Sequence, residues 1–292
     1  MLLHIRARVQ LIMAVGQSVG GERWPSNGAP AVFNSRRAWH AWLILACVIG
    51  ALAAWQPDRT VTNNYRDACR HWFAGRAIYE DGPHGFLYFP HAAILYAPFT
   101  VLPPPFGGVV WRLVSIGSVA LAVWRLASLL TPESKKGFAF AVLTCLVIPP
   151  ALASARNGQM NLVLSGLLTL AFVDIAYGRW RWAACWLCLG AACKPLIIAP
   201  LAVAAVAYPP LRRPLICGAI ALLVAPFLTQ HPGYVWQQYR ACAHKLLLAG
   251  NPGWENPGSD LFGLLSSIGY FAPLEVQTAT RIAAGALTLG LA

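Results

Sequence analysis

The sequence predicts an all-α, polytopic transmembrane helical bundle with a helix lying on the membrane surface in its first loop. Two observations lead to this fold class. Hydrophobic residues make up 58% of the chain and charged residues 11%, whereas ordinary soluble domains carry roughly 25% charged residues. The apolar stretches, such as 39–55 and 107–130, are long and continuous instead of alternating. This pattern favours spanning helices over the strands of a barrel.

The elements follow in chain order. The first 38 residues contain five arginines and lead directly into an apolar stretch, so we expect a basic cytoplasmic segment over 1–38. A multi-pass transmembrane domain is then expected over 39–292. Its apolar spans are predicted at 39–55, 107–130, 138–153, 160–177, 183–193, 195–208, 215–229 and 274–292. The proline-rich stretch 90–105 is interpreted as a short segment that dips into the membrane.

Positive charge predicts the orientation of these spans. With the N-terminus inside, the short cytoplasmic connections contain Lys135, Lys136, Arg179, Arg181, Arg212 and Arg213, as the positive-inside rule expects. The outer side then receives 56–88, 156–159, the break at 194–195 and 230–260. Nearly all the remaining polar residues fall in these outer segments, which predicts a functional site at the non-cytoplasmic membrane surface.

Composition and motifs exclude several function classes. The net charge is +12, but Lys and Arg are dispersed between apolar spans and do not form the single basic face of a nucleic-acid-binding protein. No Walker A, dinucleotide or HExxH motif occurs, and neither a Cys/His ligand set nor a close pair of carboxylates indicates a metal site. We therefore expect no cofactor, no metal and no nucleic-acid partner.

The first outer loop contains an amphipathic segment over 64–79. Its apolar or aromatic residues are spaced along one face of a helix, which is typical of a helix lying on a membrane; they are Tyr65, Ala68, Cys69, Trp72 and Phe73. The other face is expected to present Arg66, Asp67, Arg70 and His71. This face either places a carboxylate beside several cations for chemistry or is an ordinary interfacial face in which Asp67 pairs with Arg70 or His71.

Two further positions are candidates for binding an anion or a sugar. The turn Arg156-Asn157-Gly158-Gln159 joins two apolar spans, and its guanidinium and amides suit a phosphate or a sugar hydroxyl, or else simply satisfy water and backbone groups. Lys194 interrupts an apolar stretch, and a cation there is either a functional group or a side chain that reaches the headgroups from a helix end at Pro195.

The final outer loop mixes aromatic residues with hydrogen-bond donors. Tyr234 and Gln238 belong to this group, and such side chains suit sugars and phosphates, although Tyr and Trp are also ordinary interface anchors. Asp174 lies near the cytoplasmic end of its span, close to Arg179 and Arg181, and is interpreted as a member of a structural ion pair.

Four segments together carry a resemblance to a known family. They are YRDACRHWFAGRAIY over 65–79, LYFPHAAILYAPFTVLPPP over 87–105, RNGQMN over 156–161 and LCLGAACKPLIIAPL over 187–201. Over 65–239 the chain resembles glycosyltransferase family 87, membrane mannosyltransferases of the GT-C superfamily that use polyprenyl-phosphate-mannose as donor. The resemblance implies a GT-C-like fold in the cell membrane, a polyprenyl-phosphate sugar donor, a lipid or glycan acceptor, and contact with membrane lipids.

The resemblance also implies roles for individual residues. An Asp in the first outer loop would act as general base with inversion at the sugar carbon, and Asp67 and Asp58 are the candidates. Basic residues would hold the lipid phosphate as it leaves; these are Arg66, Arg70, Arg156 and Lys194. The sugar or the acceptor would contact Asn157, Gln159, Asn161, Tyr234 and Gln238.

The chain departs from the family pattern at two places. Thr62 stands where the family has its acid, and the usual Tyr-Pro-Pro is replaced by Phe89-Pro90-His91. The chain ends at Ala292 inside an apolar run, whereas family members usually continue through further helices, so we expect a fragment or a shortened member. Two alternatives to a mannosyltransferase stay open, namely a secondary transporter with a discontinuous helix at 194–195 and a non-catalytic scaffold subunit.

Overall fold

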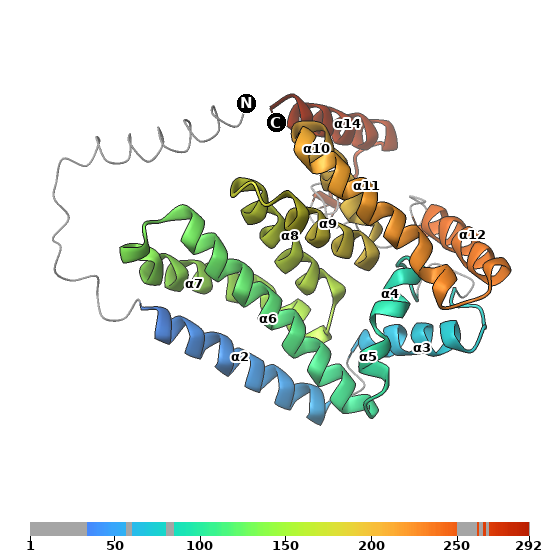
Figure 1. Ribbon diagram of the computed structural model, residues 1–292, viewed down its shortest axis with the longest axis horizontal. Helices are drawn as coiled ribbons and strands as arrows, with labels where there is room; N and C mark the ends of the chain where they lie inside the picture. The colour runs from blue at the N-terminus through green and yellow to red at the C-terminus, as the bar shows by residue number, and fades with distance from the viewer. Residues whose placement is uncertain are drawn as a thin grey trace.

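The computed structural model describes residues 34–56, 60–79, 85–249, 262, 265–266 and 269–291. Over these residues the protein is an all-α bundle without strands, which confirms the predicted fold class (Figure 1). The long helices are α2 (Ser35–Trp55), α6 (Pro104–Leu130), α7 (Lys136–Asn157), α8 (Met160–Ala176), α9 (Trp180–Cys193), α11 (Pro209–Val224), α12 (Pro232–Ala249) and α14 (Leu274–Leu291). The short ones are α3 (Thr62–Phe73), α4 (Pro90–Leu95), α5 (Ala97–Thr100) and α10 (Ile198–Ala207), with 3₁₀ turns η1 (Glu133–Lys135), η2 (Pro195–Ile197) and η3 (Ala225–Leu228).

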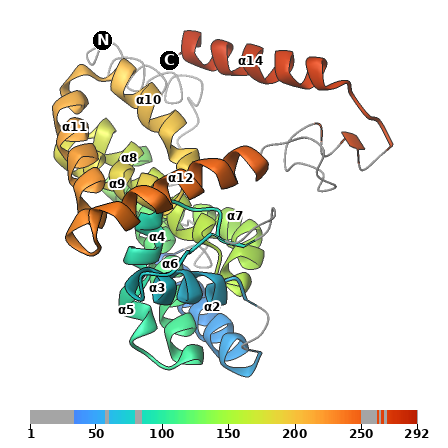
Figure 2. The same cartoon turned by 90° about the vertical axis from the view of Figure 1, so that its right-hand side faces the viewer.

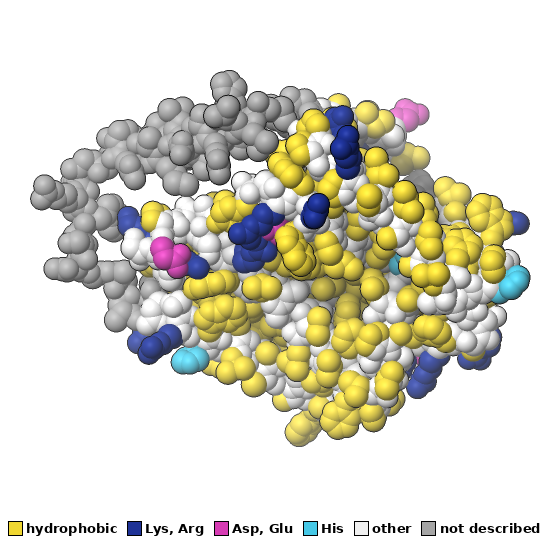
Figure 3. Space-filling model, viewed as in Figure 1, with side chains coloured by type: hydrophobic (Ala, Val, Ile, Leu, Met, Phe, Trp, Pro, Cys, Tyr) yellow, Lys and Arg dark blue, Asp and Glu magenta, His cyan; other side chains and the backbone are white. Residues whose placement is uncertain are grey.

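Among the described segments, four are long and apolar enough to cross a membrane. They are Ser35–Trp55, Pro104–Leu130, Glu133–Asn157 and Pro209–Leu228. Their outward side chains are large and apolar, as Leu43, Ile44 and Val48 on α2 are, and Figure 3 shows such side chains across much of one face of the molecule. Hydrocarbon accepts this kind of surface, whereas a soluble monomer rarely exposes a continuous apolar area of that extent.

Helix α6 lies at the centre of the bundle and packs against α2, α7 and α8. Small residues let the backbones approach closely, as is common where helices meet in membranes. A Cβ built at Gly166 of α8 would stand 2.6 Å from Ser118 Oγ and 2.9 Å from the Ser118 carbonyl carbon of α6. Gly166 is therefore required by the crossing of α6 and α8.

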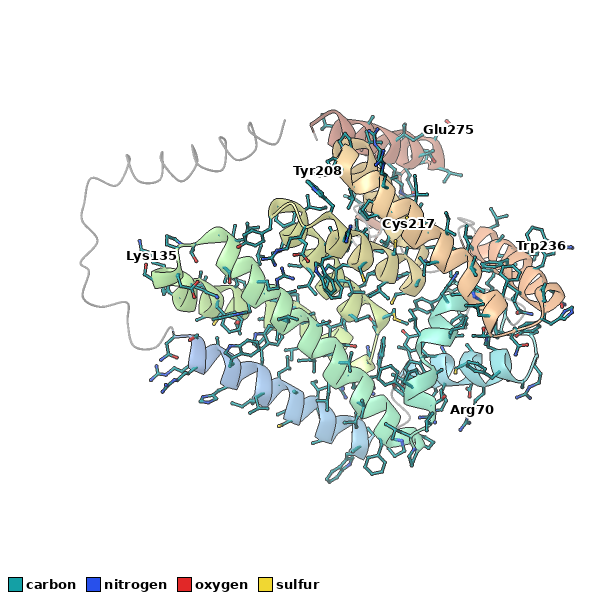
Figure 4. The ribbon with its side chains drawn as sticks, in the orientation of Figure 1. Arg70, Lys135, Tyr208, Cys217, Trp236 and Glu275 are labelled. Atoms are coloured by element: carbon teal, nitrogen blue, oxygen red, sulfur yellow. The ribbon has the colours of Figure 1, made fainter. Side chains whose placement is uncertain are left out.

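One end of the bundle gathers the connections that carry the predicted cytoplasmic cations; we call it the basic end. Asp174 of α8 is fully buried there, and its carboxylate accepts from Arg125 Nη2 at 2.6 Å and from Trp186 Nε1 at 2.8 Å. Arg179 lies 3.8 Å away. The predicted structural pairing of Asp174 is confirmed, with Arg125 of α6 as its nearest partner. Figure 4 labels Lys135 at this end.

The opposite end, which we call the pocket end, holds α3, α4 and α5 (Figure 2). The segment 90–105, expected to dip into the membrane, forms α4 and α5, both too short to span, and ends in the first two residues of α6. Tyr96 between them is buried against Tyr65 of α3 and Trp111 of α6. This aromatic cluster fixes α3 across the end of the bundle.

Candidate functional site

Helix α3 overlaps the first part of the predicted amphipathic segment 64–79, beginning two residues earlier, and it buries four of the five residues predicted for the buried face. Tyr65, Ala68, Cys69 and Trp72 are all at most 3% exposed. The helix ends at Phe73 because Gly75 takes the left-handed conformation, with φ +66°, which stops the helix short of residue 79. Phe73 was expected on the buried face, but it is half exposed.

Arg66 was expected on the exposed face of α3, and this expectation is wrong. Its side chain is 5% exposed and donates from Nη1 and Nη2 to the carbonyl oxygens of Phe99 and Leu102, each at 3.1 Å. These carbonyls lie at the C-terminal end of α5, where helix carbonyls lack intrahelical partners and attract cations. Arg66 thus joins α3 to α5 from inside the protein.

Asp67 and Arg70 lie on the exposed face of α3, as expected. No described residue forms an ion pair with Asp67, so its anticipated pairing with Arg70 or His71 is not observed. His71 instead places Nδ1 3.0 Å from the Ala77 carbonyl oxygen. Figure 4 shows Arg70 pointing away from the bundle. The second candidate base, Asp58, lies outside the described residues.

The turn between α7 and α8 is held through its backbone. The carbonyl of Arg156 accepts from Arg112 Nε and Nη2 at 3.1 and 3.0 Å, and that of Asn157 accepts from the Val61 amide at 3.1 Å. The carbonyl of Gly158 accepts from Trp111 Nε1 at 2.9 Å. Three consecutive carbonyls therefore point into the protein, where buried backbone groups need such partners.

Tyr65 supports the next residue of this turn. Its hydroxyl accepts from the Met160 amide at 3.1 Å and lies 3.1 Å from the hydroxyl of Tyr88. Burial, with a smaller contribution from Tyr88, raises the pKa of Tyr65 well above its ordinary value, so the hydroxyl stays protonated. The first amide of α8 is thus fixed to α3.

An open pocket of about 560 Å³ lies beside this turn. Its wall consists of Thr60 and Val61, which precede α3, and of Ala153, Arg156 and Asn157 at the end of α7. The Arg156 side chain is exposed, and no described residue accepts a hydrogen bond from it or from the Asn157 amide. Gln159 does not line the pocket; its side-chain oxygen accepts from Ser154 at 3.1 Å. Within the described part of the chain, the pocket therefore offers a guanidinium and an amide that have no side-chain hydrogen bonds of their own.

Lys194 lies at the break between α9 and η2 and is half-buried. Its Nζ donates to Asn161 Oδ1 of α8 at 2.9 Å. No described carboxylate neutralises this ammonium group. The structure thus brings together Lys194 and Asn161, two residues singled out independently from the sequence.

The residues from the last loop face another part of the protein. Tyr234 donates to the Arg76 carbonyl at 2.7 Å, and Gln238, which is fully buried, accepts from the Ile78 amide at 3.2 Å. Both side chains therefore fasten α12 to the segment after α3. On the opposite side of α12, Trp236 points outward (Figure 4).

Charge is distributed unevenly between the two ends. All three ion pairs among the described residues, formed by Arg125, Arg179 and Lys136 with Asp174 and Glu133, lie at the basic end. At the pocket end no described carboxylate forms an ion pair with Arg66, Arg112 or Arg156. Within the described residues no cluster of His, Cys, Asp and Glu could hold a metal ion. Arg156 on the pocket wall and Lys194 at the break before η2 are cations of the kind that binds anionic groups.

Comparison with known proteins gives one match. A model of glycosyltransferase family 87 matches residues 86–292, which is more than half of the chain and includes α4 to α14. No curated protein and no solved structure shows a significant match.

Proposed function

The chain belongs to glycosyltransferase family 87, and from this membership we propose that it transfers a hexose, mannose in the first instance, from a polyprenyl-phosphate-linked donor to a lipid or glycan acceptor. The observation that carries the proposal is the pocket whose wall includes the exposed Arg156, a side chain with no hydrogen-bond or ion-pair partner among the described residues. A lipid phosphate is an anion that a guanidinium binds well, and it needs no nucleotide-binding fold.

The chemistry follows from the proposed donor. The acceptor hydroxyl attacks the anomeric carbon, the bond from that carbon to the phosphate oxygen breaks, and polyprenyl phosphate leaves with the negative charge. A cation beside the phosphate stabilises that developing charge. We assign this role to Arg156, with Lys194 as a second cation that also bonds Asn161. Asn157 supplies an amide to the sugar within the same pocket.

A carboxylate accepts the proton of the acceptor hydroxyl, and the product sugar is inverted because a single displacement occurs. Asp67 and Asp58 are the two proposed bases. Asp67 is available, since it is exposed and has no described ion-pair partner. Asp58 stands two residues before Thr60, a pocket residue, in the sequence. We propose a metal-independent reaction, because the guanidinium and ammonium groups provide the positive charge.

The proposed location follows from the distribution of charge. The cations in the short connections of the basic end fit the cytoplasmic side of a membrane. The pocket end then faces the non-cytoplasmic side of the cell membrane, where a polyprenyl-phosphate sugar can be reached without nucleotide. GT-C-like architecture is part of the same proposal.

The test is transfer of labelled mannose from polyprenyl-phosphate-mannose by the full chain in lipid nanodiscs. Arg156→Ala should lower transfer by about tenfold or more, the effect of losing one charge-assisted contact. Arg213→Ala is the matched control, because it removes an exposed arginine at the basic end. Asp67→Asn and Asp58→Asn compare the two bases, and the true base is the one whose loss abolishes transfer.

Two results would overturn the proposal. One is the absence of turnover with every polyprenyl-phosphate sugar in well-folded protein, which would favour a transporter or a scaffold subunit. The other is an Arg156→Ala variant as active as Arg213→Ala, which would place the phosphate elsewhere.

A further inference from the structure

Arg112 of α6 is a buried cation that no carboxylate of the described residues neutralises. Its side chain is 3% exposed. Burying a guanidinium is costly unless its N–H groups find acceptors. Here Nη1 donates to the Gly108 carbonyl at 2.9 Å, Nη2 donates to Thr60 Oγ1 at 2.7 Å, and Nε and Nη2 both donate to the Arg156 carbonyl. Only one of these acceptors, the Gly108 carbonyl, belongs to α6. The other two acceptors belong to segments that are distant from α6 in the sequence.

Those two distant segments are the two walls of the pocket. Thr60 and Val61 form one wall, and Arg156 and Asn157 belong to the other. Thr60 and Asn157 are 97 residues apart in the sequence. Two hydrogen bonds join the walls directly, from the Val61 amide and the Thr60 hydroxyl to the Asn157 carbonyl, at 3.1 and 3.3 Å. A single guanidinium that reaches both walls therefore contributes a large share of their connection.

We propose that Arg112 is a positioning residue, which holds the Arg156 backbone against Thr60 so that the Arg156 side chain projects into the pocket. It acts through Arg156 and does not bind the ligand, because its side chain is buried and four of its five N–H groups donate to protein oxygens. The consequence of this inference for catalysis rests on the proposed function. The link that Arg112 makes between Thr60 and the Arg156 carbonyl, which we call the tether, is independent of any activity.

The geometry requires arginine. The planar fork carries five N–H groups in fixed directions, and here it spans acceptors on three segments at once. A lysine has one nitrogen and reaches fewer of them. Arg112→Lys should therefore restore part of the function lost in Arg112→Gln.

The experiment has two readouts on the full chain in nanodiscs. The first is hydrogen exchange of the peptide that contains Val61, whose amide donates to the Asn157 carbonyl. Exchange there should be faster in Arg112→Gln than in wild type. The second is transfer from polyprenyl-phosphate-mannose, in which kcat/KM for the donor should fall by about tenfold or more. Both KM and kcat should change, because a displaced Arg156 loses the phosphate in the ground state and the developing charge in the transition state.

Arg125→Gln is the control for general destabilisation. It also removes a largely buried arginine from α6, but at the basic end. It should leave both exchange at Val61 and kcat/KM for the donor at their wild-type values. If Arg112→Gln does not fold, Thr60→Ala removes the hydroxyl that accepts from Nη2, and the same changes are expected in smaller degree.

The outcomes separate the two proposals. Unchanged exchange at Val61 in Arg112→Gln would overturn the tether. Faster exchange with an unchanged kcat/KM for the donor would overturn the positioning role. A wild-type protein without transfer activity would contradict the proposed function, while the exchange measurement would still decide whether Arg112 joins the pocket walls.

Discussion

Replacing Gly158 by Ala tests why the turn of the RNGQ motif contains a glycine. Gly158 ends α7 in the left-handed conformation, with φ +67°. An L residue other than Gly, Asn or Asp pays roughly 1–2 kcal/mol there. A Cβ at this position would also stand 2.6 Å from Thr62 Cγ2 and 3.2 Å from Arg112 Cζ. Overpacking of this kind costs about 1–3 kcal/mol. Together we expect Gly158→Ala to lower the free energy of unfolding by about 2–5 kcal/mol.

The two contributions can be separated by denaturant unfolding of the purified protein. Thr62→Ser removes Cγ2 and retains the hydroxyl, so the double variant should recover the steric part and keep a loss of about 1–2 kcal/mol. Gly117→Ala is the control, because nothing lies within 4 Å of its Cβ position inside α6. The reasoning fails if Gly158→Ala is as stable as Gly117→Ala, or if Thr62→Ser recovers nothing.

Two further predictions concern the bundle away from the pocket. Asp174→Asn leaves Arg125 without its carboxylate partner, and breaking a buried ion pair usually lowers the free energy of unfolding by about 3–5 kcal/mol. Because the Arg125 side chain is 23% exposed, we expect a value near the lower end, about 3 kcal/mol. Unfolding measurements on the single variant and on Asp174→Leu with Arg125→Met check this, because the double variant should recover most of the loss. Gly166→Ala forces α6 and α8 apart at the Ser118 backbone, and it should lower the free energy of unfolding by about 1–3 kcal/mol in the same assay. Gly50→Ala, whose Cβ would meet its nearest neighbour at an ordinary 3.6 Å, should cost less, and equal losses at the two glycines would contradict the close-crossing argument.

The fold could be predicted largely from the sequence because its signals are local. Long apolar stretches gave the helices, and the observed bounds differ mainly at their starts, as for α2, which begins at Ser35 and not at residue 39. The buried face of α3 followed from helical spacing. The pairing of Asp174 followed from its nearness in sequence to Arg179, although the closer partner, Arg125, comes from another helix.

The site was predicted less well because its arrangement depends on contacts between distant segments. Helical periodicity placed Arg66 on the polar face, and only the carbonyls at the end of α5 explain its burial. Nothing in the spacing of Tyr234 and Gln238 shows that their polar atoms meet the backbone at residues 76 and 78. Arg112 was missed, although a charged residue inside an apolar span was a usable signal.

The cations Arg66, Arg112, Arg156 and Lys194 fall into two groups according to their hydrogen-bond partners. Arg66 and Arg112 are buried and donate to backbone carbonyls and one hydroxyl, so they join segments of the protein. Arg156 is exposed on the pocket wall, and Lys194 bonds only an amide among the described residues. Among the described contacts, none has to break for a phosphate to bind the Arg156 side chain, and Lys194 has two N–H groups besides the one that bonds Asn161. Binding Arg66 would first release the carbonyl oxygens of Phe99 and Leu102. For this reason the proposed phosphate site is centred on Arg156 and Lys194, and Arg66 is better understood as support for α3.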